Sequence, residues 1–319
     1  MHKEQYKGKE TGMEIIAGTK DFEWTCETAV AMGKFDGIHV GHKRLLEHIL
    51  ECRKSGLKAC VFTFDPTPSV LFGLSDGKEL STLTEKRAAF ERMGVDILVE
   101  FPLTKETAAI PAEEFLREYL CERMHAKLIA AGEDVSFGKF GSGNAALLEA
   151  CKDTYQYDLC LIEKVCVNGE PVSSTRIRGA VEAGEMEEAA RLLGSPYQVG
   201  GLVESGAGLG HTIGFPTANL MPGPSKLLPP KGVYFSRALV NGRWHAAISN
   251  IGCKPTVNRD KAIGVETYLY DFDEDIYGAE MTVELLRFVR PERRFAGVEE
   301  LKKTVHENLL QGAEYHGKL

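Results

Sequence analysis

Two histidines three residues apart stand at the start of a predicted helix, where their side chains could bind phosphate. In the stretch 28–50, the apolar run 29–32 predicts a buried strand, and the helical spacing of leucine and isoleucine further on predicts a helix that begins near Gly41. A strand that turns at a glycine into a helix N-terminus directs backbone N–H groups outward, and the helix dipole there favours anions. His39 and His42 could donate hydrogen bonds to phosphate oxygens without a permanent like-charge clash.

The residues around these histidines help to distinguish a surface loop, a zinc site and a phosphate-binding site. An isolated H-x-x-H often only decorates a loop, and a zinc protease needs H-E-x-x-H within a helix and a third ligand. The packed string G-x-F-D-G-x-H-x-G-H resembles instead the ATP-binding signature of the HxGH nucleotidyltransferase superfamily. That resemblance implies ATP contacts at Gly33, Phe35, Asp36 and Gly41.

A second cluster of hydroxyl and guanidinium groups follows a predicted strand at residues 173–178, Ser-Ser-Thr-Arg-Ile-Arg. Hydroxyls at a helix start cap backbone N–H groups, and this role alone would explain Ser174 and Thr175. Arg176 and Arg178 add two phosphate-matching forks on one helical turn. Together with the histidine turn, the cluster predicts the second half of a triphosphate clamp.

A third motif, Gly-Leu-Gly-His-Thr-Ile-Gly-Phe-Pro-Thr-Ala-Asn, occupies residues 208–219. Its glycines would let backbone N–H groups approach phosphates closely. The pattern G-x-x-x-x-G-K-[ST] is absent, so this is no ordinary P-loop. The Thr217 hydroxyl could ligate Mg²⁺, which prefers oxygen donors, and Asn219 could hold the same metal or phosphates.

The elements that must position these motifs fall into two classes along the chain. Residues 13–167 alternate strand-like apolar runs with helical patterns, which predicts a parallel sheet in a Rossmann-like α/β domain. Ligands of such folds lie beyond the carboxyl ends of the strands. Three segments should therefore converge at one edge of the sheet: the histidine turn, residues 65–68 and residues 132–138.

The pattern changes after about Leu193, where glycine, proline and alternating polarity replace helical periodicity. Alternating runs flank a strong hairpin turn at Asn241-Gly242, further runs follow, and one amphipathic helix begins after Gly297. Five or six strands closed by a helix predict a small antiparallel β-barrel. We place the two domains at residues 13–194 and 195–319.

Composition excludes several classes of protein. The net charge is −8 and no basic stripe occurs, which argues against nucleic acid as a partner. No apolar run reaches the roughly 20 residues of a membrane helix, and the polar N-terminus lacks a signal region. The eight cysteines form no C-x-x-C pair, which is typical of reduced thiols in a cytoplasmic protein.

These motifs occur in the order seen in prokaryotic FAD synthetases, which are bifunctional riboflavin kinase/FMN adenylyltransferases, and the resemblance covers nearly the whole chain after residue 12. It implies catalytic roles for His39 and His42 in the first domain and for Glu266 as the base in the second. The flavin contacts that it implies in the first domain are Phe64, Pro66, Asp134 and Phe137.

In the second domain the resemblance implies an ATP site and a flavin site. The implied ATP contacts are Gly208, Gly210, Gly214, Pro216, Asn219 and Asn250, with Thr217 and Asn219 as metal ligands. The implied flavin contacts are Gly232, Tyr234 and Arg290. This chain departs from the family pattern at four positions, which are Thr67, Val135, Ser136 and His211.

The resemblance implies an enzyme that makes FMN from riboflavin and then FAD from FMN, using ATP and Mg²⁺. It acts on small molecules as a monomer or weak homo-oligomer, without nucleic acid or membrane. The departures at Thr67, Val135 and Ser136 leave open a riboflavin kinase whose adenylyltransferase domain has decayed. A flavin-binding regulator without turnover is a further alternative.

Overall fold

The structure is a computed structural model that describes residues 6–7, 12–74, 76–204, 215–254 and 262–318. The chain divides into two compact units, Met1–Ser173 and Ser174–Leu319. The sequence-based boundary after residue 194 would place two further helices in the first domain, and it stays a prediction.

The first unit is built on a seven-stranded sheet in the order β1-β2-β5-β4-β3-β6-β7, in which β1 alone is antiparallel to its neighbour. Its strands are β1 (Tyr6–Lys7), β2 (Glu14–Ala17), β3 (Thr28–Met32), β4 (Lys58–Asp65), β5 (Ile97–Pro102), β6 (Ala126–Gly132) and β7 (Asp158–Ile162), followed by a hairpin of β8 (Cys166–Val167) and β9 (Glu170–Pro171). The parallel sheet and its helical crossovers confirm the predicted α/β class.

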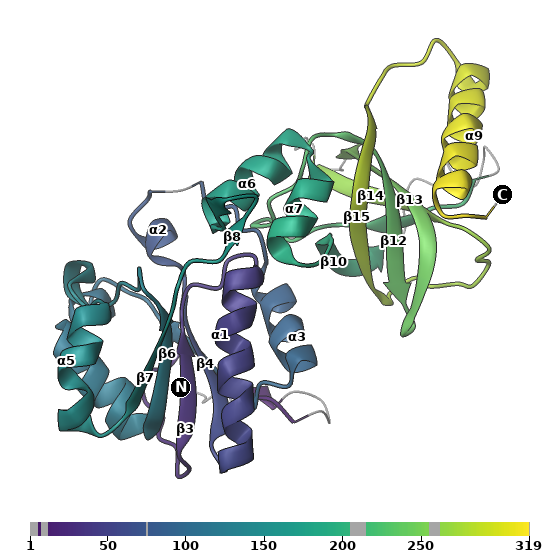
Figure 1. Cartoon of the computed structure of the whole chain (residues 1–319). Helices are drawn as coiled ribbons and strands as arrows, with labels where there is room; N and C mark the ends of the chain where they lie inside the picture. The colour runs from purple at the N-terminus through teal and green to yellow at the C-terminus, as the bar shows by residue number, and fades with distance from the viewer. Residues whose placement is uncertain (1–5, 8–11, 75, 205–214, 255–261, 319) are drawn as a thin grey trace. The chain divides into compact units, whose positions relative to one another are not determined.

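Helices cover both faces of this sheet. They are α1 (Val40–Glu51), α2 (Pro68–Leu71), α3 (Leu83–Met93), α4 (Ala112–Phe115) and α5 (Ala145–Tyr155), with a π-helix at Leu116–Arg123 and short 3₁₀ turns at Cys52–Ser55, Thr107–Ala109 and Lys139–Gly141. Figure 1 shows α1 and α3 on one side of the sheet and α5 on the other.

The central strand β3 is buried along its whole length, which explains its continuous apolar sequence. Successive side chains of a strand point to opposite faces. Ala29 and Ala31 pack on the side of α1 and α3, whereas Val30 and Met32 pack on the opposite side with the phenylalanines that surround Phe115. The small alanines let α1 lie close to the sheet.

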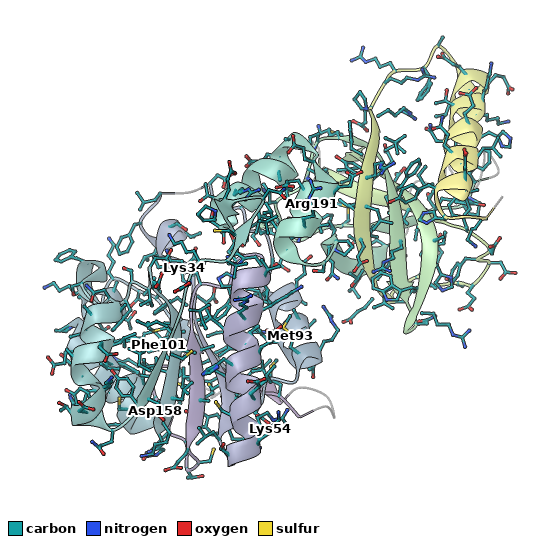
Figure 2. The ribbon with its side chains drawn as sticks, in the orientation of Figure 1. Lys34, Lys54, Met93, Phe101, Asp158 and Arg191 are labelled. Carbon is teal, nitrogen blue, oxygen red and sulfur yellow. The ribbon has the colours of Figure 1, made fainter. Side chains whose placement is uncertain are left out.

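The three segments expected to converge do follow three neighbouring strands. β4, β3 and β6 lie side by side in parallel, so residues 65–68, the histidine turn and residues 132–138 leave the sheet at the same edge. Figure 2 shows Lys34 at the end of the sheet where α1 begins, whereas Lys54 and Asp158 lie at the opposite end.

The second unit begins with two helices, α6 (Ser174–Ala183) and α7 (Met186–Leu193), and continues into a closed barrel in the order β10-β11-β14-β13-β12-β15. The strands are β10 (Tyr197–Glu204), β11 (Ala218–Leu220), β12 (Gly232–Val240), β13 (Arg243–Lys254), β14 (Ala262–Leu269) and β15 (Glu280–Pro291). All pairs are antiparallel, and Asn241-Gly242 joins β12 to β13, so the predicted barrel and hairpin are confirmed.

The C-terminal helix α9 (Val298–Tyr315) covers part of the outer barrel wall, as Figure 1 shows. Leu309 packs with Val233 and Phe235 of β12, and the Tyr270 hydroxyl donates to the Leu309 carbonyl at 2.7 Å. Helix α7 belongs to this unit because it contacts β10 and β15, and Arg287 of β15 pairs with Glu187 at 2.6 Å. Among the described residues, no helix is both long enough and apolar enough to cross a bilayer.

The sequence pattern also offers Thr84 as the N-cap of a helix through Met93 and residues 159–167 as one strand, and both of these local predictions were wrong. The N-cap of α3 is Thr82 rather than Thr84, because Thr82 and Glu85 form a reciprocal capping box. The predicted strand over residues 159–167 divides into β7 and β8. The helix predicted to open at Pro111 is present: its four α-helical residues continue directly as the π-helix.

Candidate active sites

The histidine turn joins β3 to α1 and places both imidazoles at the helix N-terminus. His39 is the N-cap of α1, and its Nδ1 accepts a hydrogen bond from the His42 backbone N–H at 3.3 Å. The two rings stack with centroids 3.7 Å apart and planes 16° from parallel. The structure therefore brings together the two residues whose spacing predicted a phosphate site.

Burial keeps both rings neutral. Burial lowers the pKa of His39 to about 4, against the opposing charges of Asp134 and Asp36. Burial also lowers the pKa of His42, and the neighbouring His39 adds to this effect. Because Nδ1 of neutral His39 accepts from an amide, its proton lies on Nε2, which can donate to a ligand oxygen.

His42 has a different environment from His39. Its Nδ1 is buried and has no hydrogen-bond partner among the described residues. Its ring centroid lies 5.0 Å from that of Phe35, which is fully buried. The ring is thus stacked on His39 and contacted at a tilt of 48° by Phe35, and we expect any polar contact to a ligand at Nε2.

Two residues of the histidine turn have positive φ angles, and hydrogen bonds to a neighbouring segment hold the turn in place. Phe35 has φ +50° and Gly37 has φ +65°, and a Cβ at Gly37 would come within 2.8 Å of Leu80 Cδ1. Asp36 Oδ1 accepts hydrogen bonds from the backbone N–H groups of Leu80 at 2.7 Å and Ser81 at 3.4 Å. Asp36 thus ties the turn to the segment before α3.

The predicted flavin contacts of this unit share an aromatic cluster. The rings of Phe64 and Phe137 both contact Phe115, at centroid distances of 6.0 and 5.8 Å, although they lie on different strand-end segments. Pro66 is exposed beside them, and exposed Asp134 pairs with Lys164 at 3.1 Å. The two rings are therefore part of the buried core at this edge of the sheet, whereas Pro66 and Asp134 are exposed.

Three of the four departures from the family pattern lie in this same neighbourhood. Thr67 is buried, and its hydroxyl lies 3.1 Å from that of Ser69. Val135 packs against the aromatic core, and the Ser136 hydroxyl donates to the Gly141 carbonyl at 3.3 Å. All three side chains therefore have local packing or hydrogen-bonding partners.

The hydroxyl and arginine cluster lies at the start of α6, where Ser174 is the first helical residue and Ser173 precedes it. Within the second unit, Arg176 Nη2 donates to Glu188 Oε1 of α7 at 2.7 Å, and Arg191 donates to the other oxygen of Glu188. The sequence did not predict this partner. The expectation that Arg176 and Arg178 complete a clamp with the histidines stays a prediction.

A second candidate site lies on the outer wall of the barrel, where five residues share one row. In the strand register, Asn219 of β11 lies opposite Glu266 of β14, Glu266 opposite Asn250 of β13, Asn250 opposite Val233 of β12, and Val233 opposite Arg290 of β15. Residues directly opposite each other point to the same face. The structure thus brings together four predicted site residues from four strands.

The interior of the barrel identifies which face this row occupies. Ser249 and Thr267, the neighbours of Asn250 and Glu266, are almost fully buried and hydrogen-bonded to each other at 2.8 Å. Ser236 extends the same chain at 2.8 Å from Ser249. Since neighbouring residues point to opposite faces, half-buried Glu266 lies on the outer wall.

Part of the predicted ATP site precedes β11. Asn219 is buried, and its Nδ2 donates to the Thr217 carbonyl at 3.5 Å, with Pro216 exposed before them. The hydroxyl and amide oxygens of Thr217 and Asn219 are the donor types that suit Mg²⁺. Gly208, Gly210, Gly214 and His211 lie outside the described residues.

The predicted flavin contacts lie at the ends of β12 and β15. Gly232 has φ +152°, and a Cβ there would come 2.2 Å from the Arg290 carbonyl oxygen, so only glycine fits. Tyr234 is fully buried, and its hydroxyl donates to the Pro230 carbonyl, so its ring has a packing role inside the barrel.

Arg290 is held by a residue that the sequence did not predict. Asn308 of α9 accepts from Arg290 Nε at 3.0 Å and from Nη2 at 2.7 Å. Burial lowers the pKa of Arg290, and nearby Arg293 adds to this effect. Asn308 could have been found from the sequence as a polar residue within the apolar face of the predicted C-terminal helix.

Comparison with known proteins assigns one family to each half of the chain. The FAD synthetase family matches residues 22–176, and the riboflavin kinase family matches residues 193–315. These ranges contain the histidine turn and the Glu266 row, respectively.

Relatives match over almost the full length. The bifunctional riboflavin kinase/FMN adenylyltransferase of Listeria monocytogenes is 37% identical over 88% of this chain and 90% of its own. That of Escherichia coli K12 is 34% identical over 96% of this chain and 98% of its own. A crystal structure titled macrolide-efflux protein from Streptococcus pneumoniae is 30% identical, with a TM-score of 0.80 over 92% of this chain and 96% of that one.

Proposed function

Because this chain belongs to the family of bifunctional riboflavin kinase/FMN adenylyltransferases, we propose that its two sites divide the two reactions between them. The enzyme phosphorylates riboflavin to FMN and adenylylates FMN to FAD, with ATP as donor in both steps. The turn at His39 and His42 serves the adenylyl transfer, and the row around Glu266 serves the phosphorylation. The observation that supports this division is that each family matches the half of the chain containing that site.

In the barrel, Glu266 accepts the proton of the terminal ribityl hydroxyl of riboflavin as that oxygen attacks the γ-phosphorus of ATP and ADP leaves. Its position between Asn219 and Asn250 supports this role, because two amide side chains can hold ATP or the ribityl chain beside the carboxylate. Arg290, fixed by Asn308, holds the flavin end of the site.

In the first unit, an oxygen of the FMN phosphate attacks the α-phosphorus of ATP, and pyrophosphate leaves. The nucleophile is already an anion, so the step needs positioning and charge stabilisation more than a base. His39 Nε2–H, His42 and the amides at the start of α1 point donors at the phosphates. Phe64 and Phe137 form the floor under the flavin, and phosphate binding is the role we propose for Arg176 and Arg178.

We propose Mg²⁺ as the metal that accompanies ATP. Within the described parts of the chain, no cluster of three or more histidine, cysteine or acidic side chains could hold a metal ion. Mg²⁺ bound with a nucleotide needs few protein ligands besides the phosphates, so Thr217 and Asn219 suffice as the donor set. When bound, the metal neutralises charge on the phosphates.

The cytoplasm is the proposed compartment, supported by eight cysteines that all have free thiols. The enzyme acts on riboflavin, FMN and ATP, and no nucleic acid or membrane enters the proposal.

The test is to incubate the protein with riboflavin and Mg-ATP and to resolve FMN from FAD over time. FMN should appear first and FAD should follow, with pyrophosphate released when FMN is supplied directly. FMN without FAD would identify a kinase with an inactive adenylyltransferase. Flavin binding without ATP consumption would identify a regulator and overturn both assignments.

A further inference from the structure

Helix α3 carries a buried lysine, Lys86, that has no role in the adenylyl transfer proposed above. The side chain of Lys86 is only 3% exposed, and lysine is almost never buried to this extent without a partner. Its Nζ lies 3.6 Å from Oε1 of Glu79, which is itself 19% exposed. A buried ammonium is costly unless an opposite charge accompanies it, so we treat the two residues as a pair.

The surroundings of Glu79 make its charge dependent on this lysine. Burial raises the pKa of Glu79, the charge of Lys86 opposes that rise, and the charges of Asp36 and Asp65 add to it. These acidic residues belong to the histidine turn and to the end of β4. The ion pair therefore lies at the edge of the sheet where the site is built.

Glu79 directly precedes the two backbone amides that hold the histidine turn. The N–H groups of Leu80 and Ser81 both donate to Asp36 Oδ1, at 2.7 and 3.4 Å. The side chain of Leu80 is 1% exposed and packs against Gly37. The ion pair with Lys86 therefore restrains residues 79–81, and these residues in turn hold the Asp36 carboxylate.

The same helix face supports the turn at a second point. Phe90 follows Lys86 by four residues, and its ring meets Phe35 edge-on at a centroid distance of 5.4 Å. Phe35 in turn contacts His42. Phe90 thus packs α3 against the turn, in which Phe35 and Gly37 have positive φ.

We propose that Lys86 and Glu79 are a positioning pair for adenylyl transfer. The buried ion pair fixes residues 79–81, which hold Asp36, and thereby sets the position of His39 and His42 under the phosphates. The proposal rests on the adenylyltransferase role of the histidine turn. It assigns no contact with substrate to either residue of the pair.

The test uses the full chain, in which the kinase reaction reports on the amount of folded enzyme. Lys86→Met should lower kcat/KM for ATP in FAD formation by about tenfold or more, because small displacements of positioned groups are costly. FMN formation should stay within about twofold of the parent. The control Lys58→Met removes a lysine that also lies 3.6 Å from its partner, Asp96, at the opposite end of the sheet, and should change neither reaction.

The double variant Lys86→Met/Glu79→Gln separates positioning from stability. Removing one partner leaves a buried charge uncompensated, whereas removing both restores charge balance, so the melting temperature should recover toward that of the parent. FAD formation should stay slow, because segment 79–81 has lost its anchor. If FAD formation recovers together with stability, the pair is only structural and the proposal is wrong. If Lys86→Met does not fold, the double variant alone tests the positioning role. If the parent enzyme makes no FAD from FMN, the adenylyltransferase role of the histidine turn is wrong, and not the role of the pair within it.

Discussion

The imidazole rings of His39 and His42 stack at a centroid distance of 3.7 Å, an arrangement that two charged rings would oppose. Burial lowers the pKa of both residues, to about 4 for His39, so both rings are neutral near pH 7. The turn can therefore offer N–H donors to phosphate while the N-terminus of α1 supplies partial positive charge. Neutral donors avoid repulsion before ATP arrives.

Replacing His42 with alanine should impair FAD formation and leave FMN formation unchanged. The substitution removes the proposed phosphate donor and a ring that contacts both His39 and Phe35. Loss of one pre-positioned donor to a developing charge typically costs about 10²–10³-fold in rate. His48→Ala on the last turn of the same helix is the matched control and should leave FAD formation intact. Parental FAD formation by His42→Ala would remove His42 from the site.

The same pKa shifts predict that the first unit loses stability in acid. The pKa of each histidine is lower in the folded than in the unfolded chain, so the unfolded chain binds more protons as the pH falls. The free energy of unfolding is therefore highest above about pH 6.5 and falls as the pH approaches about 4. At about 1.4 kcal/mol per pKa unit, the lowering of the His39 pKa from 6.5 to about 4 corresponds to a loss of about 3–4 kcal/mol once the pH is below about 4.

The two tryptophans allow this loss to be measured in the full chain. Trp24 lies in the first unit and Trp244 in the second, so Trp244→Phe leaves Trp24 fluorescence as a reporter of the first unit. Denaturant titrations near pH 7.5 and pH 4.5 are then compared with those of His39→Gln/His42→Gln in the same background. The histidine-free variant should lose less stability, and equal losses would show that the histidines titrate normally.

In the barrel, Glu266→Gln should lower FMN formation by about 10²–10⁴-fold, because glutamine cannot accept the ribityl proton. Adenylylation of supplied FMN should be unchanged. Glu280→Gln replaces an exposed glutamate on β15 and serves as the control. Retention of a near-parental rate by Glu266→Gln would exclude Glu266 as the base.

Motifs and periodicity predicted the parts of this fold that local chemistry determines. The apolar run of β3, the Asn241-Gly242 hairpin and the helix that begins at the histidine turn each depend on neighbouring residues. The convergence of three strand ends followed from the rule that ligands lie at the carboxyl edge of parallel strands. The row around Glu266 followed only from family resemblance, because strand register depends on pairing between distant segments.

What the sequence could not predict are partners that tertiary packing selects. Three side-chain pairs join residues of separate elements, and none of them forms a recognisable sequence motif. They are Arg176 with Glu188, Arg290 with Asn308, and Lys86 with Glu79. Thr82 was missed as a helix cap because Thr84, two residues later, also fits a cap by type alone. The capping box with Glu85 resolves the ambiguity only when both hydrogen bonds are visible.

Asn308 gives a prediction about riboflavin binding that is independent of Glu266. Its side-chain oxygen accepts two hydrogen bonds from Arg290, which fixes the plane of the guanidinium at the flavin end of the proposed site. Asn308→Ala should raise KM for riboflavin by about tenfold, since a hydrogen bond to a charged group contributes about 1.5–3 kcal/mol. FAD formation from supplied FMN should not change. Arg290→Lys should have a similar effect, because an ammonium cannot reproduce the paired hydrogen bonds of the guanidinium to Asn308. If Arg290→Lys raises KM for riboflavin but Asn308→Ala leaves it at the parental value, then Arg290 does not need Asn308 for its role.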